Sequence, residues 1–234
     1  TTMGAGPSRE TVRLIAHRGF DDQHSANTVA AVERAVPHAD IVELDVRRCA
    51  SGELVVAHDA LADIDIDGVS RVSDLTAAEL AALDAHDGEG IQTLATVLDA
   101  VPADTGVNLE LKSADVAADA LAAARETEHD VVLSSFDADA LRRVDVGDVP
   151  GVELAYVLGA TPSDDVALAA DLGCAFVHPN AWACLLTGVV RAAHDAGLGV
   201  NAWTVESRPG AWALRRRGVD GVIASSPHVT AWVE

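Results

Sequence analysis

Short β-branched runs alternate with alanine-rich stretches along most of the 234-residue chain. This alternation is typical of βαβ units, in which a crossover helix follows each buried strand. It predicts eight parallel strands, near residues 12–17, 40–46, 106–112, 130–135, 152–157, 174–178, 198–204 and 220–224. It also predicts helices near residues 27–36, 92–100, 115–127, 137–144, 163–171, 185–196 and 208–216. Eight strands of this kind favour an α/β fold whose sheet closes into a (β/α)8 barrel.

One segment breaks the alternation after the second strand. Only seven residues separate Asp45 from Glu53, too few for a crossover helix, which needs a dozen or more. We therefore expect residues 53–57 to pair antiparallel with the second strand as a small inserted hairpin. With a turn at residues 50–52, the expected register places His58 opposite Glu43 on the same face of the pair.

The stretch 59–90 that follows the hairpin is rich in Asp and Gly. We expect it to lie over the barrel mouth as an insertion with a short helix near 76–84, serving either as a lid or as a solvated acidic loop. Residues 1–11 are expected to be an N-terminal extension, and residues 12–234 a single domain. A chain of 234 residues with 49% hydrophobic content matches one barrel of this class, typically ~250 residues.

The charge balance narrows the possible partners. A net charge of −21 argues against nucleic acid, because the phosphate backbone would be repelled. The chain is also rich in alanine and has one lysine, Lys112. Together with the acidic excess, this composition suggests adaptation to concentrated salt, where self-repulsion is screened. Stability that depends on molar salt is therefore expected.

The cysteine content and the hydropathy of the chain indicate its cellular compartment. Cys49, Cys174 and Cys184 are odd in number and show no C-x-x-C spacing, so we expect neither a disulfide framework nor a zinc site. No apolar stretch approaches the ~20 residues that span a bilayer, and the first ten residues lack the features of a signal peptide. These observations predict a cytoplasmic protein with reduced thiols and no stable membrane insertion.

Reactive side chains recur where the apolar runs end. The runs finish in His17-Arg18-Gly19, Glu43-Leu44-Asp45, His58-Asp59 and Glu110-Leu111-Lys112. If the strand ends meet at one mouth, they bring together two imidazoles, at least three carboxylates, a guanidinium and the ammonium group of the chain's one lysine. This combination outlines a metal-assisted phosphate site.

The acidic residues are the candidate metal ligands. Glu43 and Asp45 lie two apart on one strand and so point the same way, and Glu110 on a neighbouring strand supplies a third carboxylate. Oxygen ligands favour a hard cation, Ca²⁺ or Mg²⁺, with Mn²⁺ as a further option. A single Glu-x-Asp pair is otherwise most often a solvated strand face.

The two histidines are the candidate proton carriers. Imidazole is the side chain that ordinarily changes charge near neutral pH, so His17 and His58 are expected to supply the base and the acid that phosphodiester hydrolysis requires. Arg18 and Lys112 are expected to hold phosphate oxygens. Trp203 ends the seventh strand and is equally consistent with substrate contact or core packing. The other histidines are expected to be structural or exposed, with a minor binding role left open for His178.

These residues resemble the motifs of the glycerophosphodiester phosphodiesterase family. The shared motifs occur in the family's order from about Val12 to Val229, and they comprise His17-Arg18-Gly19, Asn27-Thr28, Glu43-x-Asp45-Val46, His58-Asp59, Thr93-Leu94, Leu109-Glu110-Leu111-Lys112, Ser135-Phe136, Trp203-Thr204-Val205 and Gly218-Val219-Asp220-Gly221. The resemblance implies a TIM barrel that uses Ca²⁺ or Mg²⁺ to hydrolyse small-molecule glycerophosphodiesters to glycerol phosphate and an alcohol.

The resemblance also implies roles for individual residues. His17 and His58 would be the acid/base pair, Glu43, Asp45 and Glu110 the metal ligands, and Arg18 and Lys112 the phosphate contacts. The nucleophile is either a glycerol hydroxyl, which gives a cyclic phosphate first, or water. The chain departs from the family at Ala26, where a Glu is usual, at Gln92, where a Pro is usual, and at Ser225-Ser226, where Thr-Asp is usual.

Two rival functions remain open on the sequence. A lysine in a barrel mouth can form a Schiff base, as in aldolase-type barrels, although Glu110 beside Lys112 opposes this. The departures at Ala26 and Ser226 also allow a phosphodiester-binding barrel that has lost activity. The sequence leaves the oligomeric state undetermined.

Overall fold

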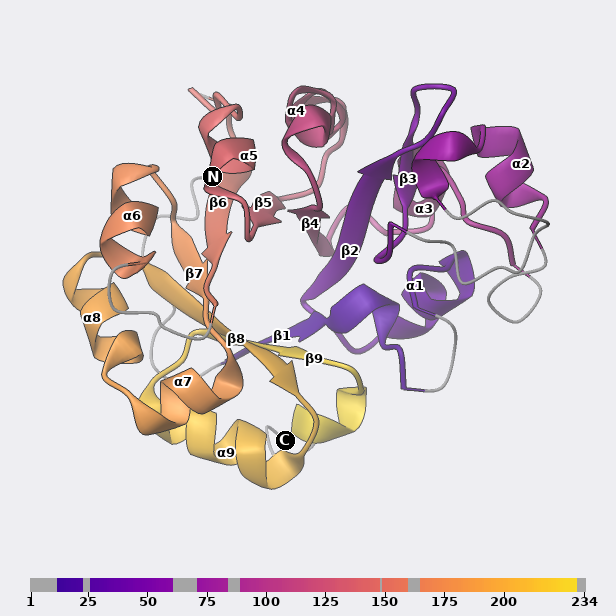
Figure 1. The fold of residues 1–234 in the computed structure, drawn as a ribbon. Coiled ribbons are helices and arrows are strands. Elements are labelled where there is room, and N and C mark those ends of the chain that lie inside the picture. The colour runs from indigo at the N-terminus through magenta and orange to yellow at the C-terminus, as the bar shows by residue number, and fades with distance from the viewer. Residues whose placement is uncertain are drawn as a thin grey trace.

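The computed structural model describes residues 12–22, 26–60, 71–83, 89–147, 149–159 and 165–230. Its barrel strands are β1 (Arg13–Ala16), β2 (Ile41–Arg48), β4 (Gly106–Leu111), β5 (Val131–Ser135), β6 (Val152–Val157), β7 (Phe176–His178), β8 (Gly199–Val205) and β9 (Gly221–Ala224). All eight pair in parallel, in the order β1-β9-β8-β7-β6-β5-β4-β2, and β2 pairs back with β1 to close the ring. Figure 1 shows this ring with helices around it. The prediction of a TIM (β/α)8 barrel is therefore confirmed.

The helices follow the predicted alternation with one difference. They are α1 (Val29–Ala35), α3 (Leu94–Leu98), α4 (Ala117–Glu126), α5 (Ala138–Arg142), α6 (Asp165–Asp171), α7 (Ala181–Leu186), α8 (Val189–Asp195) and α9 (Arg208–Arg217). The single helix predicted near 185–196 is two helices, because the Asn180 side chain caps an earlier start and the chain breaks at Gly188. None of the described helices has the length and hydrophobicity needed to cross a bilayer.

Alternation along the strands separates two environments. Outward-facing residues such as Val42, Leu44 and Leu109 are fully buried between the strands and the helices. Inside the ring, Ile15 and Ile41 form a small apolar cluster with Ile223. The polar residues of β2 follow this cluster toward the carboxyl ends of the strands. The interior therefore offers an apolar floor beneath a polar mouth.

The inserted hairpin is present, but its register was predicted wrongly by one residue. Strand β3 (Leu54–Val56) pairs antiparallel with β2, and the turn lies at residues 50–52 as expected. The three-residue turn pairs Cys49 with Glu53, and the Ala57 N–H donates to the Asp45 carbonyl at 2.9 Å. This register places His58 beside Leu44 rather than opposite Glu43.

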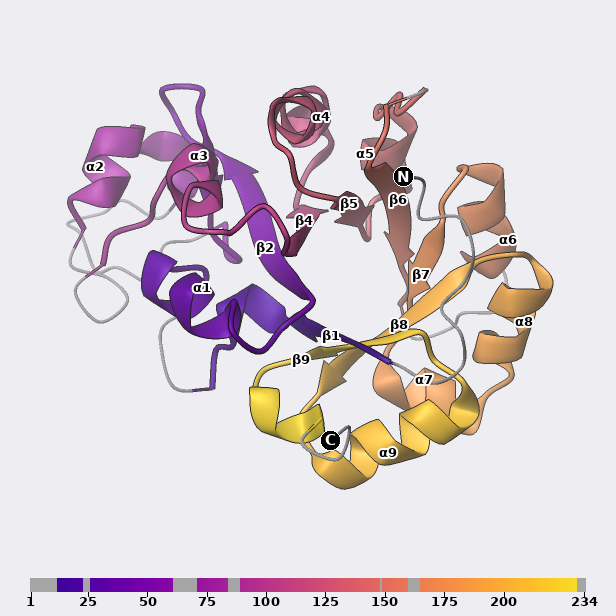
Figure 2. The ribbon, with the colours of Figure 1, turned by 180° about the vertical axis from the view of Figure 1, so that it is seen from behind.

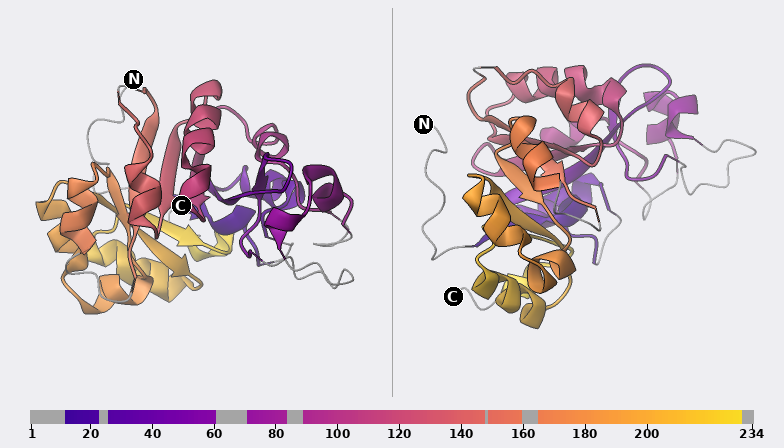
Figure 3. Two further views of the ribbon diagram at one scale, coloured as in Figure 1. Left: turned by 45° about the horizontal axis from the view of Figure 1, so that its top comes forward. Right: turned by 60° about the vertical axis from the view of Figure 1, so that its left-hand side comes forward.

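Part of the predicted insertion packs against this hairpin. The 3-10 turn η2 (Val72–Asp74) and helix α2 (Ala77–Ala81) belong to an apolar cluster with the hairpin residues Cys49, Val55 and Ala57. Helix α2 lies at the outer edge of the molecule, as Figure 2 and the left view of Figure 3 show. Residues 61–70 and 84–88 lie outside the described residues, as do residues 1–11. The placement of 59–90 over the mouth therefore stays a prediction.

Candidate active site at the carboxyl ends of the barrel strands

A cavity of about 290 Å³ opens where the parallel strands end, and we call it the mouth pocket. Its lining residues are His17, Arg18, Glu43, His58, Asn108, Glu110, Lys112, Phe136, Val157, His178, Trp203, Thr204 and Ile223. Seven of the eight residues predicted for the site are among them. The eighth, Asp45, contacts two of the lining residues, Arg18 and Lys112. The structure thus brings the predicted site residues together.

The turn after β1 has a strained backbone. In the 3-10 turn η1 (His17–Gly19), Arg18 has a φ of 51°, and Phe20 follows with a φ of 64°. Non-glycine residues in this region cost of order 1–3 kcal/mol each and persist only where their surroundings hold them. A Cβ on Gly19 would lie 2.8 Å from the backbone of α1, so only glycine fits there. The close contact with α1 fixes the turn.

This conformation directs Arg18 toward two carboxylates. Its backbone N–H donates to Glu43 Oε2 at 2.8 Å, and its side-chain Nε lies 3.1 Å from Asp45 Oδ2. Asn27, which also has a positive φ, donates from Nδ2 to the same Asp45 oxygen at 2.8 Å and accepts from the Asp45 N–H at 3.1 Å. The strained turn and its surroundings therefore hold the acidic residues in place.

Three carboxylates cluster at the base of the mouth pocket. Ligand oxygens of Glu43, Asp45 and Glu110 all lie within 4.8 Å of one another, and strand pairing places Asp45 directly beside Glu110. Glu43 is 2% exposed, and its Oε1 has no hydrogen-bond partner among the described residues. Burial, followed by the negative charges of Asp45 and Glu110, holds the pKa of Glu43 well above its usual value.

Lys112 partly balances this negative charge. Its Nζ lies 2.6 Å from Asp45 Oδ1 and also contacts Glu110 Oε1. Burial alone would lower the pKa of Lys112, but these two carboxylates raise it above its ordinary value. Burial likewise raises the pKa of Asp45, yet Lys112 and Arg18 outweigh that effect and hold the pKa below normal. The ammonium and Asp45 are therefore both charged near neutral pH.

The donor set fits a divalent cation. Three converging carboxylates offer only oxygen ligands, as hard cations require. The unpartnered, buried Glu43 Oε1 and the raised Glu43 pKa are both consistent with a position that a positive charge would stabilise. The predicted ligand set is therefore compatible with a metal site.

Each of the two histidines predicted to carry protons has an aspartate at its Nδ1. His17 Nδ1 lies 3.2 Å from Asp21 Oδ2, and His58 Nδ1 lies 2.8 Å from Asp59 Oδ1. A carboxylate at Nδ1 favours the tautomer that carries its proton there and leaves Nε2 available. Burial raises the pKa of Asp21, but its hydrogen bonds to His17 and Ser225 bring it below normal.

An arginine fixes the backbone at the second histidine. Arg47 donates from Nε and Nη2 to the His58 carbonyl oxygen, at 2.9 and 2.7 Å. This fork holds the chain at the point where it leaves the β2–β3 ladder. His58 therefore reaches the mouth pocket although its register differs from the predicted one.

Two aromatic side chains, Trp203 and Phe136, also line the mouth pocket. The Trp203 indole N–H donates to the His178 carbonyl at 2.7 Å, and Phe136 meets the Trp203 ring edge-on at a centroid distance of 5.5 Å. His178 is 1% exposed, and its Nε2 lies 3.0 Å from Asn201 Nδ2. Burial, with a smaller effect from Arg13, lowers the His178 pKa to about 3. This histidine is therefore neutral at physiological pH.

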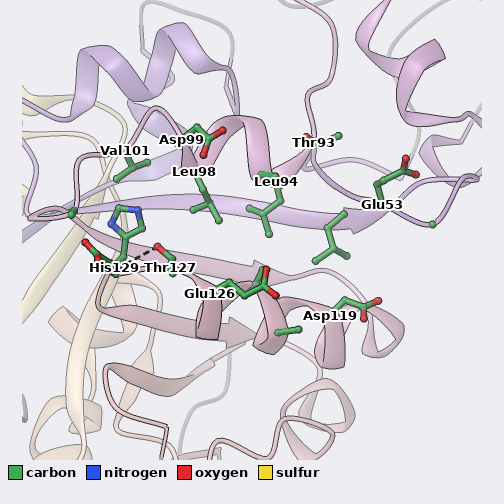
Figure 4. Close-up of a pocket in the computed structure, with 17 residues that line it drawn as sticks. Glu53, Thr93, Leu94, Leu98, Asp99, Val101, Asp119, Glu126, Thr127 and His129 are labelled. Atoms are coloured by element: carbon green, nitrogen blue, oxygen red, sulfur yellow. Dashed lines mark hydrogen bonds between the residues drawn. The ribbon is translucent and has the colours of Figure 1, made fainter.

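A larger depression of about 740 Å³ lies on the outside of the barrel between α3 and α4, and we call it the outer groove (Figure 4). Leu94, Leu98 and Val101 contribute apolar side chains, and its carboxylates are Glu53, Asp99, Asp119, Glu126 and Glu128. No lysine or arginine is among its lining residues. None of the residues predicted for catalysis lies in it.

Sequence reasoning missed several residues that support the site. Asn27 lies at the start of the helix predicted near 27–36, but Thr28 caps α1, and the Asn27 side chain donates to Asp45. Asp21 and Asp59 follow His17 and His58 closely in sequence, and this closeness could have indicated that each aspartate pairs with its histidine. The sequence contains no signal for the role of Arg47, because its contact with the His58 carbonyl depends on the hairpin register.

Comparisons with known proteins agree with this geometry. The model of the glycerophosphoryl diester phosphodiesterase family matches residues 17–229. A glycerophosphodiester phosphodiesterase from Caldanaerobacter subterraneus subsp. tengcongensis is 31% identical over 231 residues, which cover 92% of this chain and 94% of the relative.

Solved structures give the same result. The glycerophosphodiester phosphodiesterase of Thermotoga maritima superimposes with a TM-score of 0.83 at 26% identity, over 96% of this chain and 99% of that one. A phosphodiesterase of Oleispira antarctica, solved with the product sn-glycerol-3-phosphate, gives 0.82 at 27% identity, over 94% and 96%. This chain belongs to the glycerophosphoryl diester phosphodiesterase family.

Proposed function

We propose that this protein is a metal-dependent phosphoric diester hydrolase that converts glycerophosphodiesters to glycerol phosphate and an alcohol. The observation that carries the proposal is the convergence of two histidines, three carboxylates and two cationic side chains on one pocket. Family membership supports the reaction, and the product bound to the Oleispira relative supports a small-molecule substrate.

In the proposed mechanism, His17 and His58 act through Nε2. One takes the proton of the attacking hydroxyl, and the other donates a proton to the departing alkoxide. Asp21 and Asp59 hold the imidazoles in the tautomer with Nε2 free. Both water and a glycerol hydroxyl suit this pair as nucleophile, and ³¹P NMR for a cyclic phosphate intermediate distinguishes them.

Glu43, Asp45 and Glu110 would hold a divalent cation, Ca²⁺ or Mg²⁺, with Mn²⁺ as the alternative. When bound, such an ion withdraws negative charge from the phosphoryl oxygens as the transition state forms. Arg18 and Lys112 lie beside these carboxylates, where they can also bind the phosphoryl oxygens.

Two rival functions are less well supported. A Schiff base requires a neutral amine, whereas Asp45 and Glu110 raise the pKa of Lys112. A binding barrel without activity would not need both His17 and His58 in the mouth pocket beside the carboxylate cluster.

The cytoplasmic location expected from the sequence also remains part of the proposal.

Separate His17→Ala and His58→Ala variants test the mechanism. Each is expected to lower kcat for glycerophosphocholine by roughly 10²- to 10⁴-fold, with Ca²⁺, Mg²⁺ or Mn²⁺ supplied. His38→Ala is the matched control, because His38 is exposed and lies outside the mouth pocket. Wild-type-like activity in either variant removes that histidine from the mechanism, and wild-type turnover no faster than metal alone favours the binding barrel.

A further inference from the structure

A second cavity adjoins the mouth pocket. It has a volume of about 480 Å³, and we call it the apolar shelf. Its lining residues are Gly159, Asn180, Trp182, Ala183, Leu186, Thr187 and Trp203. Trp203 lines both cavities. Helix α7 supplies the shelf's apolar side chains and packs against β8, beside the end of the barrel (Figure 1).

The shelf exposes apolar surface that folding would be expected to bury. Trp182 is 68% exposed and Leu186 is 77% exposed. Among the described residues four large hydrophobic side chains are exposed, and three of them, Phe136, Trp182 and Leu186, line either the shelf or the mouth pocket. In a chain with 3% aromatic residues and a net charge of −21, this concentration indicates a binding surface.

The wall between the two cavities is held firmly. The Trp203 backbone N–H donates to the Pro179 carbonyl at 3.1 Å, and its indole N–H donates to the His178 carbonyl at 2.7 Å. Phe136 packs on its ring edge-on. A ligand whose phosphodiester occupies the mouth pocket would therefore meet a fixed aromatic surface as it extends toward the shelf.

The lining indicates the chemistry of the occupant. No acidic or basic side chain is among the shelf's described residues, although carboxylates are abundant elsewhere in this chain. The shelf has two tryptophans, Trp182 and Trp203, but its other apolar side chains, Leu186 and Ala183, are aliphatic, so it lacks the several aromatic faces that would enclose a quaternary ammonium group. An anionic membrane surface would be repelled by the net charge. An uncharged aliphatic chain fits best.

We propose that the apolar shelf binds the aliphatic chain of single-chain phosphodiester substrates, so that the enzyme also hydrolyses glycerophosphodiesters that carry one alkyl or acyl chain. This rests on the proposed function of the mouth pocket. An oxygen of water finally bonds to phosphorus, the P–O bond to the leaving alcohol breaks, and the alcohol departs with a proton. The chain lies either on the glycerol or on the leaving alcohol.

Monomeric short-chain substrates separate these two arrangements. Octanoyl-glycerophosphocholine carries the chain on glycerol, and glycerophospho-octanol carries it on the leaving alcohol. Glycerophosphocholine is the chainless reference. Leu186→Ser and Trp182→Ser are each expected to lower the ratio of kcat/KM for one chain-bearing substrate over the reference roughly tenfold. The substrate that responds identifies the position of the chain.

Trp212→Ser is the matched control, because Trp212 is 53% exposed and lines neither cavity. It is expected to leave the ratio unchanged. The proposal is wrong if the ratio of kcat/KM values is the same in wild type and in both shelf variants. It is also wrong if wild type is a dimer that Leu186→Ser dissociates while the ratios stay the same, because the shelf would then be a dimer interface.

A binding measurement separates failure of the shelf from failure of the catalytic proposal. Calorimetric titration with octylphosphocholine needs no turnover, and Leu186→Ser is expected to weaken its Kd roughly tenfold. If wild type does not hydrolyse glycerophosphocholine but Leu186→Ser still weakens the binding of octylphosphocholine, the proposed function is wrong and the shelf proposal stands. Equal Kd values would reject the shelf.

Discussion

The mouth pocket and the outer groove differ in a way that volume does not reveal. The outer groove is larger, about 740 Å³ against about 290 Å³. In the mouth pocket, buried carboxylates lie within hydrogen-bonding distance of Arg18 and Lys112. In the outer groove, carboxylates share a rim without a cation among the lining residues, and Asp119 pairs with Arg48 outside the lining. Buried groups of opposite charge, and not size, distinguish the cavity that we propose to be the active site.

The largest expected difference between the two cavities is in stability. Lys112→Met leaves Asp45 and Glu110 without their shared cation in a buried position. We expect the free energy of unfolding to fall by about 3–5 kcal/mol. In the outer groove, Asp119→Asn breaks an ion pair whose carboxylate is exposed, and the expected loss is below about 1 kcal/mol. Urea unfolding with a chelator present measures both, and equal losses would contradict the comparison.

Activity provides the next largest contrast. Glu43→Gln keeps the shape of the side chain but removes one proposed metal ligand, so kcat/KM for glycerophosphocholine is expected to drop at least about 100-fold. Glu126→Gln makes the same chemical change in the outer groove and is expected to stay within about twofold of wild type. If Glu43→Gln keeps most of the activity, the assignment of this carboxylate is wrong.

A relocated carboxylate tests how His17 is positioned. Asp21→Ser is expected to lower kcat roughly tenfold or more with little change in KM, because the imidazole tautomer is no longer held. Ser225 hydrogen-bonds to Asp21, so Asp21→Ser combined with Ser225→Asp returns a carboxylate to this neighbourhood. Partial recovery of kcat is expected in the double variant. Asp99→Asn in the outer groove is the control, and an unaltered kcat in Asp21→Ser would exclude the positioning role.

The pH dependence of stability isolates Glu43. Its folded pKa lies above the unfolded value, so its contribution is fully present below the unfolded pKa and is lost as the pH rises through the folded pKa. We therefore expect the difference in unfolding free energy between wild type and Glu43→Gln, measured with a chelator present, to decline as the pH rises above about 4.5. A difference that stays constant with pH would mean that burial does not raise the pKa of Glu43.

The smallest expected effect is the share of the salt dependence of stability that comes from the outer groove. Its like charges on an exposed rim are stabilised by screening, so added salt is expected to raise the unfolding free energy. Replacing Glu126 and Glu128 together by glutamine is expected to reduce that gain by less than about 1 kcal/mol. Full wild-type stability in dilute buffer, seen by circular dichroism, would contradict the proposed adaptation to salt.

Much of the molecule could be predicted because the relevant signals are local. Short β-branched strands and alanine-rich helices specify the barrel, and a barrel delivers strand ends to one mouth. Glu43, Asp45 and Glu110 were therefore expected to lie together, and they do. The hairpin register was wrong because it depends on how a three-residue turn pairs its flanking residues. The contact of Asn27 with Asp45 was missed because the sequence does not reveal whether the Asn27 side chain caps a helix or turns inward.

The two proposed proton carriers, His17 and His58, follow segments that differ in local stability. His17 follows a strand that is paired along both sides within the closed ring. His58 follows a three-residue strand that pairs with β2 and, on its other side, makes only an isolated bridge to Thr93. Such appended segments open with less free energy than the barrel they border. Heating is therefore expected to disable the enzyme by releasing this appendage while the barrel itself remains folded.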